Sequence, residues 1–198
     1  MRGLEQIPWL YDAMFTAMEW TGLRRWREWL ARGARGLTLE VGCGTGRNLP
    51  LYPEGARVVA LDPDLGVLLR ARSRAPGIPL VRGSAEALPF RDGAFETVVS
   101  GLVFCSVPHP ERGLAELRRV LRNDGALRMI EHVRATSRAG ARIQDFIQPA
   151  WTWACGGCYP NRDTEKNVAA AGFRIDSRSR RASGLLRRFE ARKSADGA

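Results

Sequence analysis

Residues 38–46, which read Thr-Leu-Glu-Val-Gly-Cys-Gly-Thr-Gly, constrain the fold of this chain more than any other segment. Apolar residues alternate through the first half, as is typical of a short buried strand. Three alternating glycines then permit a tight turn against a ligand, and residues 46–52 predict a helix. A strand that turns through glycines into a helix indicates an α/β fold with a ligand at the turn.

The spacing of these glycines, Gly42, Gly44 and Gly46, indicates the kind of cofactor. A dinucleotide fingerprint reads G-x-G-x-x-G and holds a pyrophosphate, but here the third glycine comes one residue early. Glu40 would repel a pyrophosphate and suits a cofactor with a cationic amino-acid part. Asp62 ends the next apolar stretch, where such folds place a carboxylate on ribose hydroxyls. A nucleoside cofactor other than NAD is therefore favoured.

This segment resembles motif I of class I S-adenosylmethionine-dependent methyltransferases. Further segments resemble the family's ribose-binding position (Asp62-Pro63), adenine-side loop (82–90), fourth strand with its substrate loop (92–107) and fifth strand (117–133). The resemblance covers roughly residues 36–173. It implies an α/β, Rossmann-like sheet of seven mostly parallel strands in the order 3-2-1-4-5-7-6, with the last-inserted strand antiparallel and helices on both faces.

The resemblance also implies S-adenosylmethionine as the cofactor and assigns residues to it. The glycine backbone and Glu40 would meet the methionine part, and Asp62 the ribose. Ser84 stands where the family often has Asp or Asn for the adenine amino group, and it carries no charge. Ser100 and Gly101, at the end of the fourth strand, would offer their backbone beside the sulfonium. The residues expected at the cofactor are Glu40, Gly42, Cys43, Gly44, Gly46, Asp62, Pro63, Ser84, Ala85, Ser100 and Gly101.

Methyl transfer from a sulfonium needs no catalytic triad, because the cofactor is already a strong electrophile and the protein has only to bind and align an acceptor. His132, at the end of the predicted fifth strand, is either a catalytic residue that takes or orients a proton, or a hydrogen-bonded structural histidine. Acceptor choice is expected within residues 144–164, which resemble small-molecule methyltransferases that include thiol methyltransferases and lie near ubiquinone and menaquinone methyltransferases. The aromatic residues there either wall the acceptor or form a packed cap. The residues expected at the acceptor are Tyr11, Phe15, Cys105, Trp151 and Tyr159.

The 198 residues read as one domain. We expect an N-terminal helical lid (1–35), a cofactor-binding core (36–132) and substrate-cap helices with a terminal hairpin (133–198). Trp26 and Trp29 are expected to pack against the sheet. The periodicity predicts strands near 37–41, 57–61, 78–82, 95–101 and 125–132, helices near 46–52, 64–74 and 110–122, and a hairpin near 173–179 and 185–192.

The net charge of +10 raises the question of nucleic-acid binding. The most basic stretch, residues 174–193, lacks the interleaved aromatic residues of single-strand binders, which favours an ordinary solvated surface. Glu5, Asp12 and Glu19 argue against a helix that lies on a membrane, because the polar face of such a helix is basic.

The four cysteines, with no secretory leader or bilayer-spanning apolar run, favour a reduced cytoplasmic protein. Cys155 and Cys158 are the close pair in the sequence, and His109 or His132 would have to converge from elsewhere to complete a tetrahedral site with them. We therefore expect no metal.

The sequence predicts methyl transfer to a small apolar acceptor. The acceptor atom, which could be a thiol sulfur, a quinone carbon or a lipid amine, is left open, and the sequence does not indicate the oligomeric state. One alternative is an RNA or protein methyltransferase, although Ser100-Gly101-Leu102-Val103 stands where an Asn/Asp-Pro-Pro-Tyr/Phe motif would follow the fourth strand. The other alternative is a cofactor-binding regulatory protein without turnover.

Overall fold

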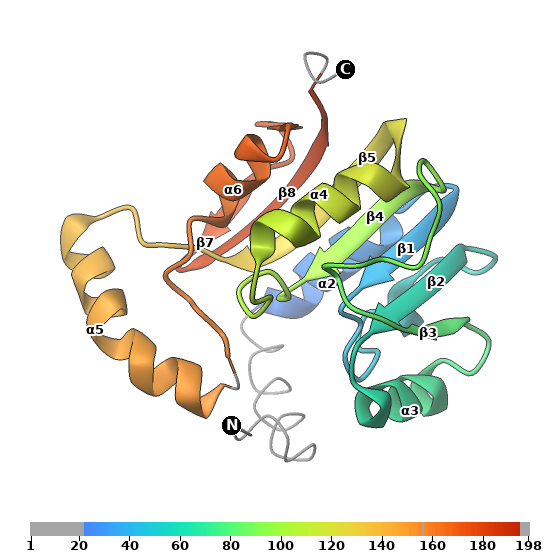
Figure 1. Ribbon diagram of the computed structural model, residues 1–198, viewed down its shortest axis with the longest axis horizontal. Helices are drawn as coiled ribbons and strands as arrows, with labels where there is room; N and C mark the ends of the chain where they lie inside the picture. The colour runs from blue at the N-terminus through green and yellow to red at the C-terminus, as the bar shows by residue number, and fades with distance from the viewer. Residues whose placement is uncertain (1–21, 156, 195–198) are drawn as a thin grey trace.

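The computed structural model describes residues 22–155 and 157–194, which alternate between strands and helices (Figure 1). The helices are α2 (Arg24–Arg32), α3 (Leu65–Arg74), α4 (Pro110–Val120), α5 (Arg138–Ala154) and α6 (Thr164–Ala170), with a single 3-10 turn, η3 (Leu49–Leu51). The strands are β1 (Leu37–Val41), β2 (Arg57–Asp62), β3 (Leu80–Arg82), β4 (Phe95–Gly101), β5 (Leu121–His132), β6 (Phe173–Ile175), β7 (Arg181–Ser183) and β8 (Leu186–Lys193).

The strands form one sheet in the order β3-β2-β1-β4-β5-β8-β6. Strands β1 to β5 are parallel to one another, whereas β8 lies antiparallel between β5 and β6. The predicted order is confirmed, with β8 as the predicted seventh strand and β7 as an additional short strand paired with it. The order reverses between β1 and β4, and ligands of open α/β sheets bind beyond the carboxyl ends of the strands at such a point.

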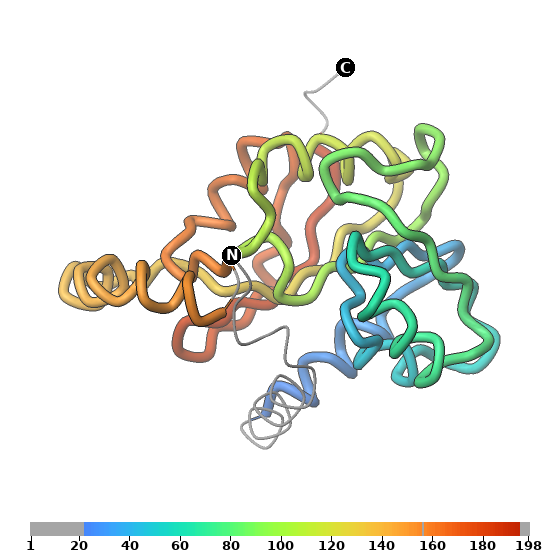
Figure 2. Tube along the Cα trace, turned by 60° about the horizontal axis from the view of Figure 1, so that its bottom comes forward, coloured from blue at the N-terminus to red at the C-terminus, as the bar shows by residue number. Residues whose placement is uncertain are grey.

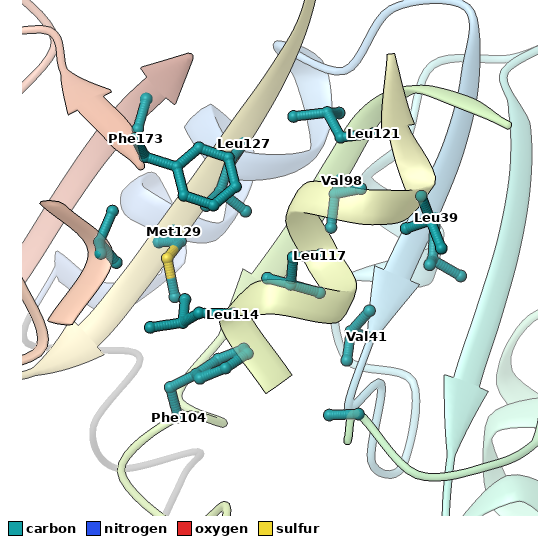
Figure 3. Close-up of a cluster of buried hydrophobic side chains, with 14 of the residues drawn as sticks. Leu39, Val41, Val98, Phe104, Leu114, Leu117, Leu121, Leu127, Met129 and Phe173 are labelled. Carbon is teal, nitrogen blue, oxygen red and sulfur yellow. The ribbon is translucent and has the colours of Figure 1, made fainter. Parts of the chain in front are cut away.

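Helices α4 and α6 cover one face of the sheet, in front in Figure 1. Leu114 and Leu117 of α4 pack with side chains of β1, β4 and β5, and the cluster continues to Phe173 beside α6 (Figure 3). All of these leucine side chains are almost completely excluded from solvent, which makes this cluster the main source of hydrophobic stabilisation.

Helices α2 and α3 cover the other face of the sheet. Leu30 of α2 packs with Val99 and Ile130, and α3 packs with β2 through Leu68. Alternate residues of each strand therefore meet different helices, which is the pattern of a sheet buried on both faces.

Arg128 of β5 fixes α2 on this face. Its guanidinium donates to the carbonyl oxygens of Leu30 (3.1 Å) and Trp29 (2.6 Å), and it pairs with Glu190 at 2.6 Å. The same group stacks 3.9 Å from the centroid of the Trp29 ring. Trp29 and Trp26 both pack in the cluster beneath α2, as predicted. The carbonyl groups at the end of α2 are thus satisfied by a buried cation.

The prediction of a helix over residues 46–52 is wrong, because only the 3-10 turn η3 forms there. Gly46 has φ +78°, outside the helical region, so the chain cannot begin a helix at that residue. Tyr52 precedes Pro53 and has ψ 145°, because proline disfavours helical geometry in the residue before it.

The boundary between the helix predicted near residues 110–122 and the strand predicted near 125–132 is also displaced. Helix α4 ends at Val120 and β5 begins at once with Leu121. Residues 123–125 lie inside the strand, where the pairing with β4 shifts between Phe95 and Thr97. The Asn-Asp-Gly sequence thus forms an irregularity within β5 and not a turn before it.

Helix α5 stands apart from the sheet (Figures 1 and 2). Ser137 caps its N-terminus by accepting from the Gly140 amide at 3.1 Å. The buried Gln144 donates to the carbonyl oxygens of Val133 (3.2 Å) and Pro160 (3.1 Å), which ties the helix to the segments that flank it. Among the described helices, none has the length and apolar content to cross a membrane.

Candidate functional site

The three glycines after β1 all have positive φ angles, of +67°, +54° and +78° at Gly42, Gly44 and Gly46. A Cβ at Gly42 would lie 2.5 Å from Val103, and one at Gly46 would lie 2.9 Å from the Ala71 backbone. A Cβ at Gly44 would meet no atom within 4 Å. Two of the glycines are therefore required by packing, and the third keeps open a surface on which a ligand can reach the backbone.

Cys43, predicted at the cofactor, turns its side chain into the protein. It is 6% exposed and packs with Leu49 beneath the loop, and this burial raises the pKa of the thiol well above its usual range. The Gly42 and Cys43 amides donate to the Leu61 carbonyl at 2.8 and 3.0 Å, which holds the loop to β2. Cys43 thus shapes the loop through its backbone.

Asp62 ends β2 beside the glycine loop, as predicted. Its Oδ2 accepts from the Gly44 amide at 2.9 Å, and its Oδ1 accepts from the Asp64 amide at 3.0 Å. Burial raises the pKa of this carboxyl above its usual value. Each carboxylate oxygen keeps further acceptor capacity, which fits the pair of hydroxyl groups of a ribose. Pro63, which follows, is exposed at the same corner.

Glu40 is 1% exposed at the end of β1. Its Oε1 accepts from Asn48 Nδ2 at 2.9 Å, and Asn48 Oδ1 accepts from Arg27 of α2 at 2.8 Å. In the described part of the chain, Glu40 Oε2 and the buried Tyr52 hydroxyl have no hydrogen bond of normal geometry. Desolvation by burial raises the pKa of Glu40 to about 7. The Tyr52 hydroxyl lies near enough to oppose this rise, but it makes no well-formed hydrogen bond to Oε2. A buried acidic oxygen with this spare acceptor capacity, close in sequence to an open glycine backbone, fits the ammonium group of an amino-acid ligand.

The predicted adenine-side loop follows β3. The Gly83 amide donates to the Asp62 carbonyl at 3.1 Å, so this loop lies next to the ribose position. Ser84 is exposed, and its hydroxyl accepts from the Glu86 amide at 3.1 Å, while Ala85 is buried. The structure brings both predicted residues to the corner formed by β2 and the glycine loop.

Glu131, buried at the end of β5, holds the loop that follows β4. Its Oε1 accepts from the amides of Val103 and Phe104, both at 3.0 Å, and its Oε2 accepts from the Cys105 amide at 3.4 Å. The Ser100 hydroxyl also donates to Oε1, at 3.3 Å. Burial raises the pKa of this carboxyl. The Ser100 side chain is thus engaged within the protein, and the predicted contact of its backbone with the cofactor stays a prediction.

His132 follows Glu131 and meets two cysteines. Its Nδ1 lies 3.9 Å from Cys158 Sγ, and one ligand atom each from Cys105, His132 and Cys158 lie within 4.8 Å of one another. Hydrogen bonds from Cys105 and His132 lower the pKa of the Cys158 thiol below its usual range, whereas the pKa of Cys105 rises well above its usual value. Cys158 therefore clusters with Cys105 and His132, and Cys155, its neighbour in sequence, is not part of this cluster.

A cavity of about 550 Å³ opens beside His132, between α5 and the turn from β7 to β8. Figures 1 and 2 show how close this turn lies to α5. Trp151, predicted at the acceptor, lines the cavity, whereas Tyr159 and Cys105 do not. Tyr11 and Phe15 lie outside the described residues. The lining consists of His132, Ala135, Gly140, Ile143, Gln144, Ile147, Trp151, Pro160, Ser183, Gly184, Leu185 and Leu186.

Tyr159 has a structural contact instead. Its amide donates to the Cys105 carbonyl at 2.7 Å, and the Arg162 guanidinium stacks 4.6 Å from the centroid of its ring. A larger hollow of about 880 Å³ lies at the opposite edge of the sheet, beside Asn123 and Lys193. None of the predicted site residues lines that hollow.

Comparison with known proteins agrees with this geometry. Residues 39–129 match the family model described as a methyltransferase domain. The human thiol S-methyltransferase TMT1B is 37% identical over 68% of this chain and 59% of its own length, so the chain spans about three fifths of that relative. A phosphatidylethanolamine N-methyltransferase from Cereibacter sphaeroides is 36% identical over 70% of this chain and 74% of its own length.

The fold agrees as well. A crystal structure from Thermotoga maritima, described as a SAM-dependent methyltransferase and possible histamine N-methyltransferase, aligns with a TM-score of 0.65 and 21% identity over 91% of this chain and 96% of its own. The glycine loop, the acidic residues at the ends of β1 and β2, and the strand order are all those of one family. The chain belongs to the class I S-adenosylmethionine-dependent methyltransferases, and this family and fold imply S-adenosylmethionine as its cofactor.

Proposed function

We propose that this protein transfers the methyl group of S-adenosylmethionine to the sulfur of a small apolar thiol. The observation that carries the proposal is the cavity beside His132. Its lining, taken over the described residues, contains no Asp, Glu, Lys or Arg, and Ile143, Ile147 and Trp151 give it apolar walls. Such walls bind an uncharged apolar molecule, because each Å² of apolar surface removed from water contributes roughly 25 cal/mol of favourable free energy.

The cavity is connected to the cofactor loop by a short series of contacts. Gly42 of the glycine loop packs against Val103, and the Val103 amide donates to Glu131 at 3.0 Å. Glu131 directly precedes His132, which lines the cavity. These contacts support an acceptor that approaches the cofactor from the His132 side.

The uncharged lining favours a thiol over an amine. A lipid amine is an ammonium ion at neutral pH, and its burial requires a carboxylate or an equivalent partner. The cavity offers none among the described residues, whereas a thiol enters as a neutral group. One relative is named a thiol S-methyltransferase and another a phosphatidylethanolamine N-methyltransferase, and the cavity supports the chemistry of the first name.

S-Adenosylmethionine, when bound, supplies an electrophilic methyl group on a sulfonium. In our proposal, Glu40 accepts from the amino group of the cofactor and Asp62 from its ribose hydroxyls, while the Gly44 backbone lies against it. The cavity walls desolvate and orient the acceptor, and His132, our candidate catalytic residue, meets the acceptor sulfur. Alignment of two reactants contributes roughly 7–11 kcal/mol to catalysis.

The test is methyl transfer from labelled S-adenosylmethionine to an arylthiol, a long-chain amine and a demethylated quinone. We expect the thiol to be methylated. Trp151→Ala should raise KM for the thiol roughly tenfold through lost apolar contact. Trp153→Ala is the matched control, because Trp153 lies on the same helix, is 69% exposed and does not line the cavity. Methylation of the amine or quinone without the thiol, or equal effects of the two variants, would contradict the proposal.

A further inference from the structure

The cluster of Cys105, His132 and Cys158 combines three metal-binding side chains from three separate segments. Cys105 lies in the loop after β4, His132 ends β5, and Cys158 follows α5. Both cysteines are buried, and His132 is half-buried. Two sulfur atoms and one imidazole nitrogen form a ligand set that suits Zn²⁺.

The backbone holds these three residues in place independently of any ion. The Cys105 amide donates to Glu131, and the Cys105 carbonyl accepts from the Tyr159 amide at 2.7 Å, which joins the segments of the two cysteines. The Cys158 carbonyl accepts from the Thr152 hydroxyl at 2.9 Å. Hydrogen bonds outside the cluster therefore fix the backbone of both cysteine residues.

The carbonyl group of His132 is held as well. It accepts from the Thr164 hydroxyl at 3.2 Å, and the residue pairs with Leu186 across the sheet. All three ligand atoms lie within 4.8 Å of one another. Tetrahedral zinc with bonds of about 2.0–2.3 Å separates its ligand atoms by roughly 3.5–3.8 Å, so the side chains need to close by only about 1 Å.

We propose that Cys105 Sγ, Cys158 Sγ and the imidazole of His132 bind one Zn²⁺ ion and leave its fourth position open toward the cavity. Of the three residues, His132 lines that cavity and Cys105 and Cys158 do not, so a molecule within the cavity meets the cluster at its His132 side. Three protein ligands with an open fourth position are the arrangement of a zinc site that binds a substrate, whereas structural zinc sites are closed by four.

The fourth ligand is the sulfur of a thiol, and this assignment rests on the proposed function. The S–H bond breaks as the sulfur bonds to zinc, and the proton leaves to solvent. Zinc binds thiolates strongly and keeps them deprotonated at neutral pH. In this form, His132 acts as a metal ligand that meets the acceptor through the metal, and no separate base is needed to deprotonate the thiol.

The first test is metal binding by the full chain under reducing conditions. We expect about one zinc per chain by elemental analysis. Substitution by Co²⁺ should give a thiolate-to-cobalt charge-transfer band together with intense visible bands of tetrahedral cobalt. Cys105→Ser and Cys158→Ser should each abolish the charge-transfer intensity or reduce metal retention at least tenfold. Cys155→Ser is the matched control and should retain the wild-type spectrum, because Cys155 lies outside the cluster.

Folding is checked separately by circular dichroism and by calorimetric binding of S-adenosylhomocysteine, which each serine variant should retain. Wild-type protein that holds no metal, a Cys158→Ser variant that keeps the cobalt spectrum, or an equal loss in Cys155→Ser would overturn the site. A disulfide between Cys105 and Cys158 that persists in reducing buffer, with no metal bound, would overturn the site too.

The second test is the addition of an arylthiol to the cobalt protein in the absence of cofactor. We expect the charge-transfer band to gain intensity, since a third sulfur joins the metal. Metal binding without this change would overturn the assignment of the fourth ligand. Undiminished thiol methylation by metal-free protein would refute a role for zinc while leaving the proposed function intact, so the two proposals fail separately.

Discussion

Glu40→Gln tests whether the charge of a buried carboxylate serves the cofactor. Glu40 is 1% exposed, and its Oε1 accepts from Asn48 at 2.9 Å. Glutamine is nearly isosteric, and its carbonyl oxygen can keep this hydrogen bond. The substitution therefore removes the charge while the shape of the loop is retained.

The magnitude follows from the pKa. Burial raises the pKa of Glu40 from 4.5 to about 7. The folded protein thus holds this proton more tightly than the unfolded chain does, so the contribution of Glu40 to stability falls as pH rises from about 4.5 to about 7. At roughly 1.4 kcal/mol for each pKa unit, the penalty in the free energy of unfolding approaches about 3.5 kcal/mol above pH 7. The Glu40→Gln variant should lack this pH dependence.

Folding favours the protonated form of Glu40, whereas cofactor binding should favour its ionised form. An ammonium ion beside Glu40 favours the carboxylate, so binding at pH 6 should release about 0.9 proton from Glu40, and affinity should rise until about pH 7. Urea denaturation at several pH values measures the first effect. Calorimetry of S-adenosylhomocysteine in buffers of different ionisation enthalpy measures the second. Equal proton release by wild type and variant, or parallel stability profiles, would refute this reasoning.

Three further outcomes are expected. Gly42→Ala should lower the free energy of unfolding by about 1–3 kcal/mol, because its Cβ would lie 2.5 Å from Val103. Gly44→Ala would meet open space and should cost only the strain of a side chain at φ +54°, about 1–2 kcal/mol, while it also weakens S-adenosylhomocysteine binding. Urea denaturation and calorimetry separate the two. In Glu131→Gln, an amide nitrogen would face the backbone donors of the loop after β4. This should lower the free energy of unfolding by about 1–3 kcal/mol, with a matching fall in the thermal midpoint. Arg128→Met leaves the last carbonyl groups of α2 unpaired and should lower the free energy of unfolding, measured by urea denaturation, by about 3 kcal/mol. A change below about 0.5 kcal/mol would show that α2 is held by apolar packing alone.

The cofactor side of the site could be predicted from the sequence because its parts are local. The three glycines and Glu40 lie in one strand-turn segment, and their conformations follow from short-range sterics. Asp62 could be added because parallel strands place their carboxyl ends at one edge. The alternation of strands and helices predicted a parallel sheet covered by helices, and the order of its strands was implied by the family resemblance.

Element boundaries were less predictable, because packing decides them. The Asn-Asp-Gly sequence at residues 123–125 is typical of a turn, yet the pairing with β4 draws it into β5. Residues 46–52 have a helical apolar pattern, but the conformations of Gly46 and Tyr52 allow only a single 3-10 turn. The lid predicted over residues 1–35 stays a prediction, because residues 1–21 lie outside the described part of the chain; α2, which follows them, packs on the sheet.

The sequence by itself determined the family, the glycine loop and the acidic residues that flank it, because each depends on neighbours within a few residues or on a fixed strand order. Only the tertiary structure decided the arrangement around Glu131 and His132, where we propose that the acceptor binds. It turned Glu131 toward three amides of another loop, and it joined Cys158 to Cys105 and His132 in place of the nearby Cys155. These contacts link segments separated by more than twenty residues, so no periodicity or spacing encodes them, and they form only when the strand ends meet.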